Sequence, residues 1–426
     1  MQKEKIIEAI ESLQIQDDFR DFIEYISTNK VKLTGTGRLG FKDCFNINQK
    51  LYHSITTEHN RIPMDKFPTI LFCFYVGQAA GIVRKSKEKS NTFLVVDDEA
   101  FEYFKSFNKV EQYFALLNNF WLNTQIDDLT GEERARDSVE TLDLILQESF
   151  AKKFHPFPKK SSFTFFWNLS NVLRQLSLLG WSECIEDGFG DMKKTIVSQI
   201  KYKPLGKYLI EILCKERLLF YWNKYARLAK TYYIENNFFT GEPEKEIPED
   251  IIEINLAKVE NEVFEAPFQE ELGDVLNKIW RAEQKNSSKE GNYIFKVSLN
   301  NKTWRRIAIA SKDTFEDLHL IIQEAFDFDN DHLYAFYPSG KLYSGVSINS
   351  PWGQELPFAD EIKLSDFELL KGESMLYLFD FGDHWEFSIE LNDMNNEKPL
   401  KKPKIIESKG EAPEQYPDWD DDEDDY

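Results

Sequence analysis

Cysteine and histidine are scarce in this chain of 426 residues, which limits the kinds of site it can build. The four cysteines are scattered with no Cys-x-x-Cys pair, so neither a zinc ribbon nor a disulfide framework is predicted. The six histidines include no His-x-x-x-His pair, and the Gly-x-Ser-x-Gly segment of serine hydrolases is also missing. We expect four reduced cysteines, a cytoplasmic location and no cofactor.

Long apolar runs are missing too. No stretch approaches the roughly 18 apolar residues of a membrane span, and no charged-then-apolar signal segment is present, so no membrane association is expected. Hydrophobic residues still make up 42% of the chain and aromatic residues 15%. That content is enough for several buried cores, and the length favours two or three domains over one.

The two halves of the chain differ in charge. Residues 1–240 carry 33 Lys and Arg against 31 Asp and Glu, whereas residues 241–426 carry 19 against 43. Residues 241–290 include Pro- and Glu-rich stretches and are predicted to form an acidic connector with a helix. Residues 397–426 are predicted to be an extension that ends in a disordered acidic tail, because its last eleven residues hold seven carboxylates. The acidic half favours a basic protein as its partner.

Residues 291–396 have the pattern of one compact domain. Two β-rich runs separated by an Asn-Asn turn predict a hairpin over 293–309. Thr314, with Asp317 three residues later, predicts the N-cap of a helix whose apolar stripe packs on a sheet. Further β-rich segments follow the helix, so the order of elements predicts an α+β domain of the β-grasp type, in which a mixed sheet wraps one helix. We expect the following side chains to share its core: Leu318, Ile322, Phe326, Phe336, Phe379 and Trp385.

A short signature, Asp-Phe-Gly-Asp-His-Trp-Glu, occupies residues 380–386 between two of these β-rich runs. Its position predicts the tight turn of a hairpin, with Gly382 supplying the left-handed backbone and Asp380 and Asp383 closing turn hydrogen bonds. The same two carboxylates could instead hold a divalent cation, since hard cations prefer oxygen ligands.

Residues 290–420 resemble the plasmid pRiA4b ORF-3-like family, whose genes also occur as passengers of insertion sequences. The family's motifs appear in order, and they are Trp304–Ile307, Thr314–Phe326, His332–Phe336, Tyr377–Glu386 and the tail segment Ile405–Pro417. One position departs from the pattern, because the family commonly carries a histidine where this chain has Phe387. That departure argues against a ligand or base at this position. The resemblance implies an association with mobile elements, while members of the family are mostly uncharacterised.

The N-terminal half contains one theme twice. An amphipathic helix over 66–81, a basic hairpin over 82–96 and a second helix are followed by a similar set from residue 163 to residue 213. This order, together with the phrase Lys-Pro-Leu-Gly at 203–206, weakly resembles winged-helix proteins. We therefore predict a mainly helical half with winged-helix-like units over 1–150 and 151–240. A helical repeat or a plain helical bundle explains the same pattern.

The basic loop of the first hairpin is the candidate nucleic-acid contact of this acidic chain. It carries Arg84, Lys85, Lys87 and Lys89, which would meet phosphate groups if this half binds nucleic acid, although a solvated surface loop is the simpler interpretation. The nearby glycines at 35, 37 and 40 match a dinucleotide-loop spacing, but no βαβ unit surrounds them. We interpret them as a turn that leads into a helix starting near Phe41.

Four residues of the acidic half are candidates for chemistry: His319, His332, Asp380 and Asp383. His319 lies beside the apolar helix stripe, where a histidine bonded within the core is the alternative to a ligand. His332 follows a carboxylate-rich loop that could equally be a solvated turn. We therefore predict a non-enzymatic binding or regulatory protein associated with mobile elements, contacting nucleic acid or a protein. A metal-assisted hydrolase or nuclease built on the Asp380 and Asp383 turn is the alternative.

Overall fold

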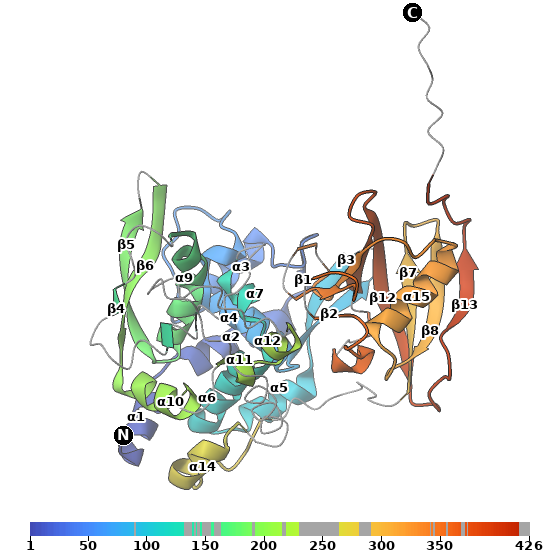
Figure 1. Ribbon diagram of the computed structural model, residues 1–426. Helices are drawn as coiled ribbons and strands as arrows, with labels where there is room; N and C mark the ends of the chain where they lie inside the picture. The colour runs from blue at the N-terminus through green and yellow to red at the C-terminus, as the bar shows by residue number, and fades with distance from the viewer. Residues whose placement is uncertain are drawn as a thin grey trace, which may run out of the picture. The chain divides into compact units, whose positions relative to one another are not determined.

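The chain folds into two compact units in the computed structural model, and each is described by itself below (Figure 1). The N-terminal unit is Met1–Glu283 and the C-terminal unit is Gln284–Tyr426. The structure describes residues 1–88, 91–131, 139, 142, 145–146, 155–156, 163–189, 192–214, 219–229, 264–280, 291–340, 342–343, 346–354, 357–367, 371–372 and 374–416.

The N-terminal unit is mainly helical, as predicted. Its first part contains α1 (Lys3–Glu11), α2 (Ile15–Thr28), β1 (Val31–Lys32), α3 (Phe41–Asn48), η1 (Met64–Lys66), α4 (Pro68–Ala79), β2 (Val83–Glu88), β3 (Asn91–Val96), α5 (Asp98–Lys105), α6 (Lys109–Asn118), η2 (Asn119–Asn123) and α7 (Ile126–Thr130). Its second part contains β4 (His155–Pro156), α9 (Phe163–Leu178), β5 (Ser182–Phe189), β6 (Met192–Tyr202), α10 (Pro204–Cys214), α11 (Leu219–Trp222), α12 (Lys224–Ala229) and α14 (Ala266–Leu272).

The same arrangement of a helix, a hairpin and a short added strand occurs in both parts. The strand orders are β1-β3-β2 and β4-β6-β5, with every pair antiparallel. A glycine with a left-handed backbone follows each helix, Gly81 after α4 and Gly180 after α9, at φ 70° and 76°. In each case the next amide donates to the carbonyl five residues back, a helix ending that glycine permits without steric cost. The repeated theme predicted from the sequence is therefore present in the fold.

α4 differs from its prediction, because it has no polar face. Its sequence, Pro-Thr-Ile-Leu-Phe-Cys-Phe-Tyr-Val-Gly-Gln-Ala, is apolar on all sides, and none of its residues is exposed. It packs on α2, α7 and α9, and Gln175 of α9 donates to the carbonyl of Pro68. The described side chains of α9 are likewise buried or half-buried. The two helices that precede the hairpins therefore lie inside the unit.

A single hydrophobic core connects the parts of the N-terminal unit. It runs from Ile6 to Trp280 and includes residues on both sides of the boundary predicted at 150, so that boundary does not separate two cores. It also includes part of the predicted connector 241–290, since Phe268 of α14 lies 4.8 Å from Phe114 between ring centroids. Residues 241–263 of that connector lie outside the described residues.

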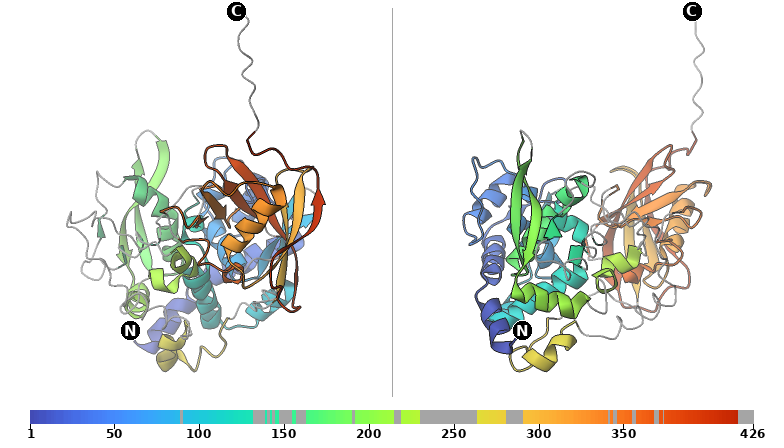
Figure 2. Two further views of the ribbon diagram at one scale, coloured as in Figure 1. Left: turned by 45° about the vertical axis from the view of Figure 1, so that its right-hand side comes forward. Right: turned by 60° about the vertical axis from the view of Figure 1, so that its left-hand side comes forward.

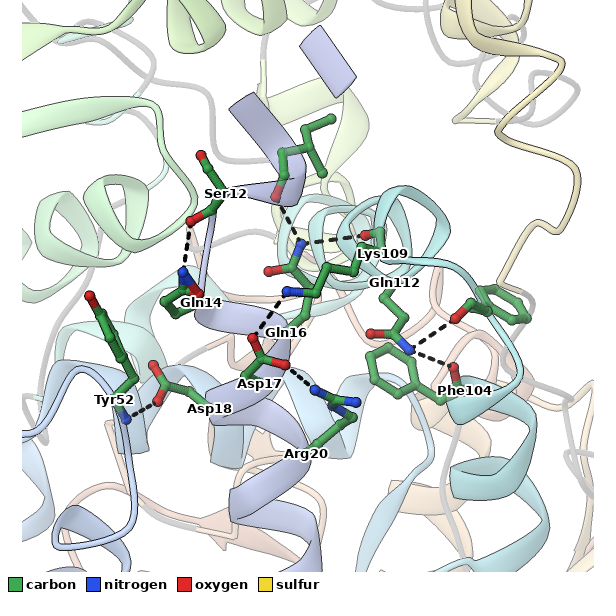
Figure 3. Close-up of polar contacts among 12 residues, drawn as sticks. Ser12, Gln14, Gln16, Asp17, Asp18, Arg20, Tyr52, Phe104, Lys109 and Gln112 are labelled. Atoms are coloured by element: carbon green, nitrogen blue, oxygen red, sulfur yellow. Dashed lines mark hydrogen bonds and ion pairs between the residues drawn. The ribbon is translucent and has the colours of Figure 1, made fainter. Parts of the chain in front are cut away.

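Polar side chains at the start of α2 connect this helix to neighbouring segments (Figure 3). Asp18 is fully buried, and its carboxylate accepts hydrogen bonds from the Tyr52 amide and from Nδ1 of His53, each at 2.5 Å. Asp17 pairs with Arg20 and with Lys109 of α6. α2 is thus connected by charge-assisted hydrogen bonds both to the loop after α3 and to α6.

The C-terminal unit is a seven-stranded sheet with one long helix on one face (Figure 2). Its elements are β7 (Asn292–Ser298), β8 (Trp304–Ala310), α15 (Phe315–Phe326), β9 (Tyr334–Tyr337), β10 (Ile348–Asn349), η4 (Leu364–Asp366), β11 (Ser374–Phe379), β12 (Trp385–Asn395) and β13 (Lys404–Lys409). The strand order is β10-β9-β11-β12-β7-β8-β13. All of these named pairs are antiparallel, so the expectation of a mixed sheet is wrong for them.

The helix of this unit begins as its sequence predicts. The Thr314 side chain accepts from the Asp317 amide at 3.2 Å, and the Asp317 carboxylate accepts from the Thr314 amide at 2.8 Å. This reciprocal capping box satisfies two amides that have no partner inside the helix. The apolar stripe of α15 is buried against the sheet, with Phe315 at 5.2 Å from Phe336 between ring centroids.

The predicted core is correct except for Trp385. Five of the six expected side chains are fully buried, while Trp385 is half-buried. Phe387 takes the central place, because it is fully buried and its ring centroid lies 4.8 Å from that of Phe326. Residues two apart on a strand share a face, so Trp385 and Phe387 both lie on the side of α15. Trp385 is the first residue of β12 and contacts Phe328, with ring centroids 5.0 Å apart, whereas Phe387 lies further along the strand and contacts Phe326.

The sheet continues beyond residue 396, where the domain was predicted to end. β13 pairs with β8, and the Arg305 guanidinium donates to the carbonyls of Ala325, Lys409 and Gly410. Part of the predicted extension is therefore an edge strand. Residues 417–426, which include most of the predicted disordered tail, lie outside the described residues.

Candidate functional site

The signature at residues 380–386 forms the turn of the hairpin between β11 and β12, as predicted. Phe379 pairs with Trp385, and the Asp380 carboxylate accepts from the Gly382 amide at 2.7 Å. The left-handed residues of this turn are Asp380 and His384, at φ 54° and 62°, whereas Gly382 lies outside that region. The expectation that Gly382 supplies the left-handed backbone is therefore wrong. Asp tolerates this conformation better than most residues because its side chain can bond its own turn.

Two of the four candidate residues are brought together at this turn. Nε2 of His332 lies 3.4 Å from the second carboxylate oxygen of Asp380, and the Asp380 amide donates to the carbonyl of Leu333 at 3.0 Å. Asp380 is buried, while His332 is exposed. Since both carboxylate oxygens of Asp380 contact partners within the turn and the adjacent loop, the residue acts here as a connection between β9 and β11.

His319 lies apart from this pair, on the buried face of α15. Its Nδ1 bonds to the Tyr377 hydroxyl at 2.7 Å and its Nε2 to the Asn330 amide oxygen at 2.8 Å. The ring also stacks on Tyr334, with centroids 3.7 Å apart. Burial lowers the pKa of His319 from its ordinary value of 6.5 to about 4, so the ring is neutral. The neutral tautomer that satisfies both bonds carries its proton on Nε2, because the Asn330 oxygen can only accept.

Asp383 is exposed at the tip of the turn. Among the described residues, no group of three or more His, Cys, Asp or Glu side chains is arranged to hold a metal ion. The four candidates thus divide into one pair, one buried core histidine and one exposed carboxylate. The exposed candidates, His332 and Asp383, provide hydrogen-bonding groups and charge at the surface.

Two residues near the C-terminus belong to this site, although the sequence analysis gave them no role. Gln415 is buried, and its side chain exchanges hydrogen bonds with the backbone of Asp329. The Tyr416 hydroxyl donates to the Asp331 carboxylate at 2.7 Å. The only sequence signal for this docking is the tail segment that contributed to the family resemblance.

Exposed apolar side chains gather at the same end of the sheet. Leu333 precedes β9, Trp352 lies in the turn after β10, and Phe381 lies in the turn after β11. Their exposures are 42%, 62% and 45%. We call these three residues, together with the carboxylates of Asp331, Asp383 and Glu386, the sheet-end surface. It was not predicted, because the residues come from three separate segments.

In the N-terminal unit, the predicted basic hairpin is formed by β2 and β3, and Arg84 and Lys85 are exposed. The Lys85 ammonium extends over the glycine turn, where a Cβ added at Gly37 would lie 3.6 Å from it. Lys89 and the side chain of Lys87 lie outside the described residues. The glycine segment is a tight turn followed by α3, as interpreted from the sequence, with the Gly37 amide bonded to the carbonyl of Thr34 at 2.9 Å.

The C-terminal segment of the chain is similar to a known protein family. Residues 292–416 match the family described as plasmid pRiA4b ORF-3-like protein. The predicted family of this segment is confirmed. The match extends from β7 through β13 to Tyr416, so the pRiA4b ORF-3-like segment contains both the sheet-end surface and the docked residues of the C-terminus.

Two further proteins are similar to part of this chain. An uncharacterized protein, y4hQ of Sinorhizobium fredii, is 29% identical over 113 residues, which are 26% of this chain and 56% of the relative. The chain therefore spans little more than half of that relative's length. A solved structure, of a protein of unknown function, MM3350 from Methanosarcina mazei, is 29% identical over 29% of this chain and 71% of that one, with a TM-score of 0.25. Within the described residues, no helix is both long enough and apolar enough to cross a membrane.

Proposed function

We propose that this chain is a non-enzymatic binding protein with a regulatory role associated with mobile elements, and that its C-terminal unit docks a protein partner. The observation that carries this proposal is the sheet-end surface, where three large apolar side chains are exposed beside carboxylates. Clustered apolar side chains on a surface mark interaction sites, whereas single exposed ones need no explanation. The association with mobile elements rests on the family of the pRiA4b ORF-3-like segment.

The bonding of the candidate catalytic residues supports binding over catalysis. Both ring nitrogens of His319 are occupied by hydrogen bonds inside the core, and the Asp380 carboxylate closes its turn. The alternative is a metal-assisted hydrolase using Asp380 and Asp383. It would need further ligands, because two carboxylates alone are a weak site for a hard cation. Titration of the full chain with Mg²⁺ or Mn²⁺ by calorimetry tests it directly, and tight binding lost in Asp383→Asn would favour it.

Site-specific crosslinking in the cell of origin tests the docking proposal. A photoreactive phenylalanine analogue replaces Phe381, and in a matched control it replaces Leu320, which is similarly exposed on α15 at 46%. We expect one or a few defined protein adducts from position 381 and none of the same adducts from position 320. Equal adducts from both positions, or none from position 381, would contradict the proposal.

A second binding activity is favoured by the exposed Arg84 and Lys85 beside the glycine turn. We propose that the two repeated parts of the N-terminal unit are winged-helix-like, supported by the order of helix, hairpin and added strand in each. The helices before the hairpins, α4 and α9, are buried against each other and cannot enter a DNA groove. Contact with nucleic acid would therefore run through the hairpin and the phosphate backbone, which predicts weak sequence preference and strong dependence on salt.

A mobility-shift assay of the full chain at low salt checks this activity. The double variant Arg84→Glu with Lys85→Glu should abolish any shift, while Lys105→Glu, which changes an exposed side chain on α5, should not. A shift that survives the double variant, or no shift at low salt, would exclude this hairpin as the contact.

A further inference from the structure

The segments of the sheet-end surface are adjacent because they lie at the ends of neighbouring strands. β10, β9 and β11 are adjacent in the sheet. The Ser350 amide donates to the carbonyl of Tyr334 at 2.9 Å, which places the turn containing Trp352 beside the start of β9. On the other side of β9, the Asp380 amide donates to the carbonyl of Leu333, which places Phe381 beside Leu333.

The apolar part of the sheet-end surface suits a short apolar segment of a partner protein. Leu333, Trp352 and Phe381 are among the most exposed large hydrophobic side chains of the C-terminal unit. Aromatic side chains at the centre of an interface contribute a large share of the binding energy, because they bury much area with few rotatable bonds. These three side chains offer apolar area to a short apolar segment of a partner.

The chain segments around these apolar side chains are strongly acidic. Residues 327–333 and 380–386 together hold six Asp and Glu and no Lys or Arg. Tyr416 bonds to Asp331 through its hydroxyl, and seven further carboxylates follow it within ten residues of sequence. The tail therefore starts at the rim of the sheet-end surface, whatever path it takes. A partner segment here meets the exposed carboxylates of Asp331, Asp383 and Glu386.

We infer that the sheet-end surface binds a segment of a partner protein that is rich in Lys and Arg and carries a central apolar side chain. This inference rests on the proposed docking function and specifies its partner. The apolar side chain contacts Leu333, Trp352 and Phe381, while basic side chains pair with Asp383 and with Glu386, whose carboxylate also lies 3.1 Å from Nδ1 of His384. Because the charged pairs lie at an exposed rim, they raise the association rate and make the binding sensitive to salt.

The test uses the full chain and fluorescein-labelled peptides, read by fluorescence anisotropy. The probe has a Leu-Phe-Leu centre flanked on each side by Lys-Arg-Lys, and the matched peptide has a Gly-Ser-Gly centre with the same flanks. We expect the apolar centre to strengthen binding by about tenfold or more. The double variant Trp352→Ser with Phe381→Ser should remove that gain, and Ile406→Ser, an exposed side chain on β13, should keep it.

The charge half of the inference has its own variant. The double variant Asp383→Lys with Glu386→Lys should bind both peptides more weakly, and its affinity should change less with salt concentration. Its circular dichroism spectrum should match that of the wild type. Equal affinity for both peptides, or a gain that survives the Trp352 and Phe381 substitutions, overturns the inference. If specific protein adducts still form from position 381 in cells while the peptides do not bind, the docking function stands and the basic partner is wrong.

Discussion

The buried His319 should make the C-terminal unit sensitive to mild acid. Its pKa is lowered to about 4 by burial, whereas in an unfolded chain it returns to its ordinary 6.5. Between these two values the unfolded state binds a proton that the folded state does not, so stability falls as the pH drops. Above pH 6.5 the ring is neutral in both states and has no such effect.

The size of the effect follows from the two pKa values of His319. Each tenfold difference in proton affinity is worth about 1.4 kcal/mol, so the full difference corresponds to about 3 kcal/mol. Most of it is already lost at pH 4.5, where about 2.5 kcal/mol is expected. That is a large part of the 5 to 15 kcal/mol that stabilises a typical domain.

Urea unfolding of wild-type protein and of His319→Gln, at pH 7 and at pH 4.5, measures this effect. At neutral pH the variant should be less stable, because it loses the stacking on Tyr334 and one hydrogen bond. On acidification the wild type should lose about 2.5 kcal/mol more than the variant, which carries no titrating ring. His384→Gln, at an exposed turn position, is the matched control and should behave as the wild type. If the wild type and His319→Gln lose equal stability between the two pH values, the reasoning about a neutral buried ring is refuted.

Three further predictions address packing and charge. Phe387→Ala should destabilise the C-terminal unit by about 3 to 5 kcal/mol, and Trp385→Ala by clearly less because Trp385 is half-buried. Chemical unfolding followed by circular dichroism measures both losses, and a larger loss in Trp385→Ala would contradict this prediction. Gly206→Ala should strongly destabilise the N-terminal unit, since the added methyl would collide with the backbone carbonyl of Trp181, just before β5. Gly35→Ala, with no atom near its Cβ position, should leave the melting temperature within a few degrees of wild type. Any nucleic-acid binding should fall steeply between low and moderate salt and be weakened by Lys85→Glu without a change in thermal stability, and a salt-independent affinity would argue against phosphate contacts.

In the candidate site, the sequence predicted the parts that depend on neighbours along the chain. The turn at residues 380–386 and the Asp380 bond to the Gly382 amide follow from residue types within one short segment. The contact between His332 and Asp380 required the strand pairing of β9 with β11. Trp352 and Tyr416 were not identified, because their exposure and docking depend on segments far away in the sequence.

The sequence by itself determined the local elements of this protein. The capping box at Thr314, the glycine ends of α4 and α9 and the repeated hairpins all arise from interactions within a few residues. Only the tertiary structure decided that α4 and α9 pack on each other and that Phe387 is buried in preference to Trp385. It also decided that β13 completes the sheet. These packing arrangements depend on which segments, far apart in the sequence, bury their apolar surfaces against each other. The pattern within one segment does not specify the segment on which it packs.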